Sequence, residues 1–219
     1  MTAGKRAFDI ALALLLLVPG LPLMLGLWCL IAARDGLPAL YTSERMKAPG
    51  RPFRLYKFRT MQKGSREAEV GVSGGDKAAR ITPLGHKLRR LRLDELPQLF
   101  NVLKGDMSFV GPRPPMRQYV EQFPELYGEV LKSRPGITGL ATIMHHSHEE
   151  SMIKHCRTAE ETEAIYVRRC IPRKAALDRL YNRRQSLCLD LYILYLTAGK
   201  LASLPGRRLQ RLRAKAARI

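Results

Sequence analysis

The sequence is poor in cysteine, and its few cysteines are not arranged as a metal site or a redox pair. Four are present, at positions 29, 156, 170 and 188. None belongs to a CxxC pair, and their spacings match no zinc-binding pattern. We therefore expect four free thiols in a protein that works in a reducing compartment.

Aromatic residues and acidic residues are also scarce. Aromatics make up only 7% of the chain, and 19 aspartates and glutamates face 38 lysines and arginines, for a net charge of +19. Such a surplus attracts polyanions, whether nucleic acid, anionic lipid or phosphorylated substrates. The chain lacks the basic stripe interleaved with aromatics that single-strand binders use. A basic nucleic-acid-binding protein is thus an alternative that the pattern does not favour.

One long stretch contains no charge at all. Residues 10–33 read IALALLLLVPGLPLMLGLWCLIAA, and a straight helix of that length would span about 36 Å, enough for a hydrocarbon core of about 30 Å. Pro19 and Pro22 interrupt it and predict a sharp kink or a break. Basic residues on both flanks would keep both ends cytoplasmic. The pattern therefore favours a re-entrant helix-break-helix, with a kinked spanning helix and a signal peptide as alternatives.

The remaining chain predicts a mainly α fold with one small β-hairpin. Residues 39–61 contain two short strands around a proline–glycine turn. Residues 81–93 form a basic amphipathic helix of the type that lies on a membrane surface, although a charged face over a core would give the same pattern. Further helices are expected at 115–132 and 187–204.

Two polar segments carry separate expectations. Residues 62–79 are glycine-rich and lack periodicity, which predicts a mobile loop that closes over a ligand. Its VSGGD stretch lacks the GKS/T ending of a P-loop. Residues 205–219 are a basic tail that anionic lipid would attract.

Two adjacent acids, Asp94 and Glu95, open the apolar segment LDELPQLFNVLKG (93–105). Aspartate is a favoured N-cap, so a well-capped helix would explain them without any chemistry. Pro97 at the third helical position would offer no amide, which leaves more of the Asp94 carboxylate free. A carboxylate can attack phosphorus, and its neighbour can hold Mg²⁺. Arg113 lies between two prolines, so its guanidinium is pre-aimed at an oxyanion.

Three stretches together resemble the bacterial sugar transferase family, the monotopic polyprenyl-phosphate phosphoglycosyl transferases of the small single-domain type. They are KFRTM (57–61), RITPLGHKLRRLRLDELPQLFNVLKGDMSFVGPRP (80–114) and RPGITG (134–139). The similarity begins at KRAFDIALALLLL and continues, with one interruption, to residue 200. The long string that contains the acid pair is the most specific part.

The resemblance implies an activity. Members of the family transfer a sugar-1-phosphate from a UDP-sugar to undecaprenyl phosphate and release UMP, which begins assembly of exopolysaccharide, capsule, O-antigen or glycoconjugate. On this chain Asp94 would be the nucleophile that forms a covalent phosphosugar intermediate, and Glu95 would bind the Mg²⁺ cofactor. Arg113 would hold phosphate. Further substrate-binding positions carried over from the family motifs are Lys57, Arg134, Gly136 and Thr138.

The resemblance also implies an organisation. Residues 1–36 would form the re-entrant membrane hairpin with its break at Pro22, to which this chain adds Pro19. Residues 37–204 would form a compact cytoplasmic catalytic domain, and 205–219 the tail. The expected location is the cytoplasmic face of the bacterial inner membrane. The expected partners are a UDP-sugar, undecaprenyl phosphate and anionic lipids, without nucleic acid; a homo-oligomer is left open.

The chain departs from the family pattern at three places. Leu21 stands where serine usually precedes the break proline, and the hairpin turn reads RMKAPG instead of containing R-x-G. Residues 143–176 form a divergent insertion or replacement with four histidines near Cys156, which leaves a zinc site open beside the simpler reading of exposed histidines. A catalytically degenerate membrane scaffold or lipid-binding paralogue is therefore the alternative to the enzyme.

Overall fold

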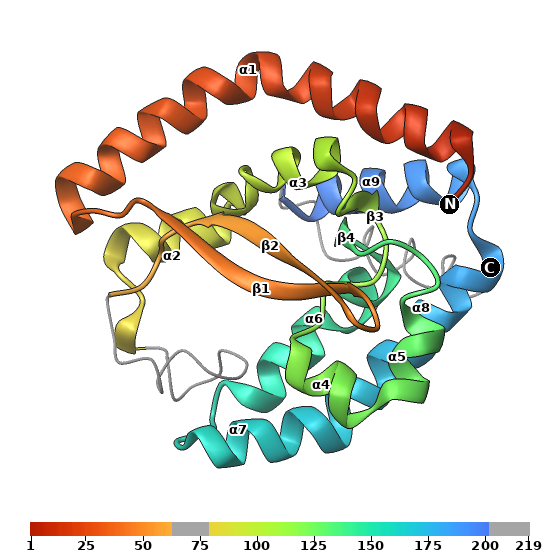
Figure 1. Ribbon diagram of the computed structural model, residues 1–219. Helices are drawn as coiled ribbons and strands as arrows, with labels where there is room; N and C mark the ends of the chain where they lie inside the picture. Colours follow the sequence, from red (N-terminus) through yellow and green to blue (C-terminus); the bar gives the residue numbers. More distant parts are fainter. Residues whose placement is uncertain (63–78, 202–219) are drawn as a thin grey trace.

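In the computed structural model, which describes residues 1–62 and 79–201, one long helix arches over a body of shorter helices and a β-hairpin (Figure 1). This helix, α1 (Ala3–Asp35), starts at the N-cap Thr2, whose hydroxyl accepts a hydrogen bond from the Lys5 amide. The mainly helical fold class is confirmed. The predicted closing loop at 62–79 lies outside the described residues except for its first and last residue. The predicted basic tail at 205–219 lies wholly outside them.

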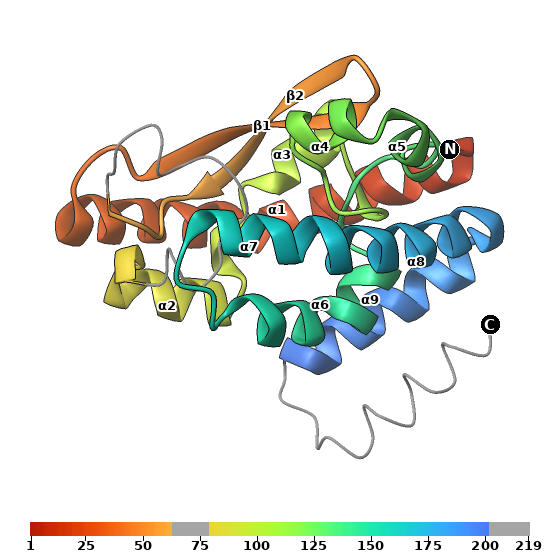
Figure 2. The same cartoon turned by 90° about the horizontal axis from the view of Figure 1, so that it is seen from below.

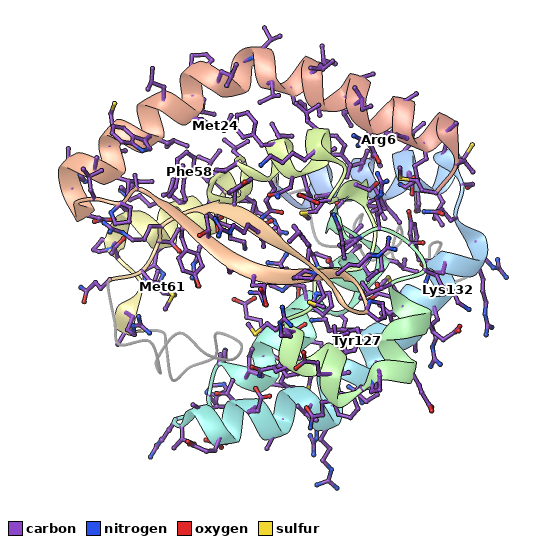
Figure 3. All side chains as sticks on the ribbon, viewed as in Figure 1. Arg6, Met24, Phe58, Met61, Tyr127 and Lys132 are labelled. Atoms are coloured by element: carbon purple, nitrogen blue, oxygen red, sulfur yellow. The ribbon has the colours of Figure 1, made fainter. Side chains whose placement is uncertain are left out.

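Helix α1 buries a single narrow face. The buried positions recur every three or four residues, as expected for one stripe of an α-helix: Lys5, Asp9, Ala13, Leu17, Gly20, Met24, Leu27 and Ile31. Figure 3 shows Arg6 and Met24 on its concave side, toward the body. The other faces expose large apolar side chains, including Leu15, Val18 and Leu25, at 65–75%. By length and composition α1 is the one helix in the described ranges able to cross a membrane.

The predicted break in α1 is wrong, because the helix continues through both prolines. Pro19 and Pro22 are exposed on the side away from the body, and the helix is bowed with that side outermost (Figure 1). Each proline removes an amide donor and crowds the preceding turn, which opens the outer side of a helix and bends it. Gly20, on the inner side, packs near Leu99 and lets the bend close onto the body.

The predicted hairpin is confirmed. Strands β1 (Leu40–Ala48) and β2 (Arg51–Phe58) pair antiparallel, with a register shift between Met46 and Ala48. Gly50 takes a positive φ of 68° in the turn, a conformation that glycine adopts without a steric penalty. Helix α2 (Pro83–Arg90), capped by Thr82, and helix α3 (Gln98–Lys104) follow.

A second, smaller strand pair crosses the centre of the molecule. Strands β3 (Ser108–Val110) and β4 (Gly136–Thr138) pair in parallel. Between them the predicted helix at 115–132 is two helices, α4 (Arg117–Gln122) and α5 (Pro124–Val130), because Pro124 cannot continue a helix and starts a new one.

The C-terminal half forms a helical layer below the strands (Figure 2). It contains α6 (Leu140–Ile153), α7 (Ala159–Ile165), a π-helical turn (Tyr166–Cys170), α8 (Ile171–Arg184) and α9 (Leu187–Leu201). The divergent residues 143–176 are thus an ordered part of this layer. The predicted apolar helix at 187–204 is confirmed as α9 within the described residues.

Candidate active site

The acid pair lies in a 3-10 helix (Leu93–Glu95) between α2 and α3. The prediction that Asp94 caps α3 is wrong: the capping position is Pro97, and α3 begins at Gln98. Proline has its φ already set for a helix start and needs no amide partner there. Arg92, two residues before Asp94, has a left-handed φ of 55°. A non-glycine residue in this conformation is strained, and such strain concentrates at functional sites.

Glu95 is held by three basic side chains. Its Oε1 atom accepts from Lys57 Nζ and Arg113 Nη2, each at 3.0 Å, and its Oε2 atom accepts from Arg92 Nη2 at 2.8 Å. The carboxylate is 7% exposed. Burial alone would raise its pKa, but Lys57, Arg113 and Arg92 together hold the pKa of Glu95 well below its usual range. Glu95 is therefore ionised.

Asp94 is in a different state, although it is adjacent and equally buried. It is 8% exposed, and no hydrogen bond or ion pair to it is found among residues 1–62 and 79–201. Burial raises the pKa of Asp94, the charge of Lys57 opposes that rise, and Glu95 adds to it. One acid is thus fixed by cations while the other keeps its oxygens uncommitted, which is the pattern of a structural carboxylate beside a reactive one.

Two further arginines interact with the charged groups of the site: Arg89 with the acid pair and Arg45 with Arg113. Arg89 donates from Nε to Thr60 Oγ1 at 2.8 Å. Burial lowers the pKa of Arg89, and the negative charge of Asp94 partly offsets that fall. Burial also lowers the pKa of Arg45, and the positive charge of Arg113 lowers it further. Neighbouring like charges of this kind stabilise a bound anion.

Arg92, Arg89 and Arg45 were not among the residues predicted for the site. Arg92 stands three residues before Glu95, a spacing at which side chains on one turn meet, so the sequence did carry a signal for it. Arg45 comes from β1, and its position beside Arg113 depends on how the hairpin packs. No local pattern reveals that.

The structure brings some of the predicted residues together and separates others. Lys57 and Arg113 meet Glu95. The guanidinium of Arg134 instead lies beside Gly105 at the far end of α3, where a Cβ would be 3.4 Å from its Nη1 atom. Thr138 is buried and its Oγ1 lies 2.8 Å from Thr197 Oγ1. Gly136 lies in β4 against Gly111. A substrate-binding role for these three residues stays a prediction.

The histidines of the divergent segment do not gather into a metal site. Within the described residues, no group of three or more His, Cys, Asp or Glu side chains is placed to hold an ion. His145 is buried rather than exposed, and burial lowers its pKa. His148 bonds to Arg173 at 2.7 Å, and all four cysteines are free thiols.

A buried carboxylate beside several cations, under a helix with an exposed apolar face, is typical of proteins that associate with membranes and bind anions. The comparison with known families makes this specific. The model of the family described as bacterial sugar transferase matches residues 1–203, so the chain belongs to this family of transferases.

Individual relatives agree. The chain is 36% identical over 90% of its length to the uncharacterized sugar transferase EpsL of Bacillus subtilis, covering 86% of that protein. It is 36% identical over 93% of its length to the UDP-N-acetylgalactosamine-undecaprenyl-phosphate N-acetylgalactosaminephosphotransferase of Aeromonas hydrophila, and 41% identical over 62% to the undecaprenyl-phosphate galactose phosphotransferase of Salmonella typhimurium. It spans only 45% and 31% of the length of these two proteins.

Proposed function

We propose that the protein transfers a sugar-1-phosphate from a UDP-sugar to undecaprenyl phosphate and releases UMP, the first step of exopolysaccharide, capsule or related glycoconjugate assembly. The observation that carries the proposal is the contrast within the acid pair. Glu95 is neutralised by three cations, whereas the Asp94 carboxylate, equally buried, has no partner among the described residues and keeps its lone pairs available. The relatives' names supply the two substrates.

The chemistry proceeds in two displacements. An oxygen of Asp94 bonds to the β-phosphorus of the donor, and the bond from that phosphorus to the bridging oxygen breaks, so UMP leaves with the electron pair. An oxygen of undecaprenyl phosphate then attacks the same phosphorus and returns the free carboxylate. Arg113 and Lys57 neutralise the phosphate oxygens as negative charge shifts from the attacking oxygen to the leaving oxygen.

The site fits Mg²⁺ that is shared between a protein carboxylate and the phosphates of the substrate. Magnesium typically takes one or two carboxylates and completes its coordination with substrate phosphates and water. Glu95 would be the carboxylate ligand and would leave Asp94 as the nucleophile, and the described residues offer no larger acidic cage. Glu95 would hold the ion by giving up one of its present cations. When bound, the ion would supply positive charge to the diphosphate.

The packing of α1 supports a bowed helix that lies along one face of the membrane, with its exposed apolar side in the lipid and both ends on the same side. At one end Lys5 Nζ bonds Asp190 Oδ2 at 2.5 Å. At the other, Arg59 donates to the Asp35 and Gly36 carbonyls, and Thr82 Oγ1 bonds Asp35 Oδ2 at 2.9 Å. Both ends therefore rest on the same body. A spanning helix would place its two ends on opposite sides of the hydrocarbon core, where one compact body could not contact both of them. We place the body on the cytoplasmic face, since both flanks are basic.

Transfer is tested with purified protein in detergent, undecaprenyl phosphate, Mg²⁺ and a panel of UDP-sugars, following UMP. Wild type should release UMP in an acceptor-dependent manner. Without acceptor, a labelled donor should leave a sugar phosphate on the protein. Asp94→Asn should lose both signals. Wild-type rates in Asp94→Asn, or no UMP from any donor, would overturn the proposal, and lipid binding without turnover would favour a scaffold.

Topology is tested by single cysteines at positions 2 and 36 in a chain with Cys29→Ala and Cys188→Ala, the two exposed native thiols. A membrane-impermeant maleimide added to intact cells should label neither end, and both should react after lysis. Labelling of one end from outside would establish a spanning helix.

A further inference from the structure

Asn101 joins helix α3 to strand β2 through its side chain. The Tyr56 amide donates to Asn101 Oδ1 at 3.1 Å, and Asn101 Nδ2 donates to the Arg54 carbonyl at 2.7 Å. These are the kinds of backbone group that an unpaired strand edge presents to a neighbouring strand. The side chain of Asn101 thus takes the place that another strand would occupy beside β2.

The two bonds fix which residues of β2 face α3. Strand β1 pairs with β2 so that Thr42 is opposite Tyr56 and Glu44 is opposite Arg54. Alternate residues of an antiparallel strand turn their backbone groups to opposite edges, so Arg54 and Tyr56, two positions apart, share one edge. Because Asn101 bonds both of them, β2 cannot slide by one residue along α3 without losing both bonds.

This register decides where Lys57 lies. Lys57 directly follows Tyr56 and lies on the same strand face as the buried Leu55. Its Nζ atom is 3.0 Å from Glu95 Oε1, and Glu95 belongs to the segment that leads into α3. A slip of one residue would turn Lys57 to the opposite face. Asn101 therefore ties together the two segments whose side chains form this ion pair.

The helix itself does not call for asparagine at this position. Asn101 is 0% exposed, and its carbonyl accepts from the Gly105 and Asp106 amides where α3 ends, a bond that any residue type could make. Asparagine is a poor helix former, and a buried amide is costly unless it is hydrogen-bonded. The contribution that an apolar side chain could not make is the pair of bonds to β2.

We propose that Asn101 is a positioning residue for the transfer: its amide holds β2 in the register that brings Lys57 to Glu95 and to the phosphates of the donor. The inference rests on the proposed function, in which Lys57 neutralises phosphate oxygens. Arg92 and Arg113 also hold Glu95, and neither belongs to β2. Loss of the Asn101 amide therefore withdraws Lys57 and leaves the acid pair in place.

The test is a double-mutant cycle between Asn101→Leu and Lys57→Met in the full chain in detergent, with UMP release and UDP affinity as readouts. Leucine has the same branched shape and no hydrogen-bonding group. Each single change should lower kcat/KM about tenfold or more, as expected when a bond to a charged group is lost. In the Lys57→Met background, Asn101→Leu should lower it less than about twofold further, because residues that act through one another are not additive.

The stability change separates this role from a purely structural one. Asn101→Leu should lower the free energy of unfolding equally in both backgrounds, because its bonds involve the backbone of β2 and not the Lys57 side chain. Losses of kcat/KM and UDP affinity that add in the cycle would mean that Asn101 only supports the fold. Unchanged turnover in Asn101→Leu would mean that Lys57 needs no clamp. Either result overturns the inference.

Lys104→Met is the matched control, because Lys104 lies on the same helix and its Nζ atom donates to the Tyr56 hydroxyl at 2.7 Å. The variant removes a contact to the same residue without touching its backbone, and it should leave kcat/KM unchanged. A loss as large as that of Asn101→Leu would show that any contact to Tyr56 has this effect, which contradicts a specific role for the amide.

Asn101→Asp covers the case in which leucine prevents folding, because it keeps an acceptor for the Tyr56 amide and loses the donor to the Arg54 carbonyl. Its loss of UDP affinity should also vanish in the Lys57→Met background, and a loss that persists there overturns the inference. A wild-type protein that binds UDP but releases no UMP from any donor is a failure of the proposed transfer alone, since UDP affinity still reports the cycle.

Discussion

Arg92 holds Glu95 at a cost in backbone strain. Its φ of 55° is unfavourable for any residue with a Cβ, and its guanidinium bonds Glu95 at 2.8 Å. Arg92→Gly should relieve about 1 kcal/mol of strain that Arg92→Ala retains. Both variants remove one cation from Glu95 and should lower turnover. Denaturant unfolding in detergent, together with UMP release, separates the two effects.

The informative comparison is between the two variants, since each loses the same side chain. We expect the Arg92→Gly protein to be more stable than the Arg92→Ala protein and both to have similar residual activity. Equal stabilities would show that the left-handed backbone stores no strain, and full activity in both would remove Arg92 from the site.

Asp178 is a second buried acid, on α8 and away from the acid pair. It is 6% exposed, its Oδ1 atom has no partner in the described part of the chain, and burial raises its pKa from 3.8 to about 7, opposed by the charge of Lys174. Between about pH 4 and pH 7, Asp178 is therefore protonated in the folded protein and ionised in the unfolded chain. Stability from this group is present below pH 4 and falls as pH rises toward 7.

Asp178→Asn should remove this dependence and stabilise the protein at pH 8 by up to about 4 kcal/mol, the value that the shift implies. Unfolding free energies of wild type and variant, measured by denaturant from pH 4 to 8, should converge at the acid end and separate at the alkaline end. Parallel curves would show that Asp178 does not titrate in this range.

At the scale of elements, the β3–β4 pair positions the segment that carries Arg113. Three glycines meet there: a Cβ on Gly111, Gly136 or Gly139 would come closer than 3.0 Å to facing backbone atoms. Gly136→Ala should therefore push the strands apart, cost several kcal/mol and lower turnover because Arg113 moves away from Glu95. Gly128→Ala in α5 is the control, since a Cβ there meets nothing within 4 Å and should be neutral or slightly stabilising.

Thermal unfolding and UMP release report on both glycine variants. A Gly136→Ala protein as stable and active as the Gly128→Ala control would show that the strands tolerate the separation, and that Arg113 does not depend on it.

The sequence predicted the elements that local patterns encode. The apolar run predicted α1, and the proline–glycine turn predicted the hairpin. The two adjacent acids in LDELP, which follow a basic segment, indicated Asp94 and Glu95 as candidate site residues. It did not predict β3 and β4, which are three residues long and pair across 25 intervening residues. It also could not show where the Arg134 side chain lies: its guanidinium is beside Gly105, and its predicted substrate-binding role stays a prediction.

The bend of α1 shows why a local rule failed. Prolines predict a break in an isolated helix, but the inner face of α1 packs on the body along its whole length, and this packing holds both halves in one helix. Tertiary contacts determine that the helix bends instead of breaking, and they join residues as far as 185 positions apart, as Lys5 and Asp190 are.

At the scale of the whole molecule, the two apolar helices α1 and α9 are joined by buried polar groups. Lys5 and Asp190 have side chains 4% and 1% exposed and lie 2.5 Å apart, and Tyr181 bonds both the other Asp190 oxygen, at 2.7 Å, and the Val110 carbonyl, at 3.1 Å. The start of α1 is thereby tied to the strand that precedes Arg113. We expect loosening of this junction to reach the active site.

Lys5→Met leaves Asp190 charged and buried without its partner, which should destabilise the protein by about 3–5 kcal/mol. Lys47→Met removes a similar bond, 2.7 Å to Asp106, from a lysine whose side chain is 36% exposed, and should cost less than about 1 kcal/mol. Lys5→Met with Asp190→Leu should recover much of the loss, because no lone charge remains. Unfolding in detergent ranks the three variants, and UMP release shows whether the junction also supports catalysis. If Lys5→Met is no less stable than the Lys47→Met control, then water or lipid reaches Asp190, and α1 is held by its apolar stripe alone.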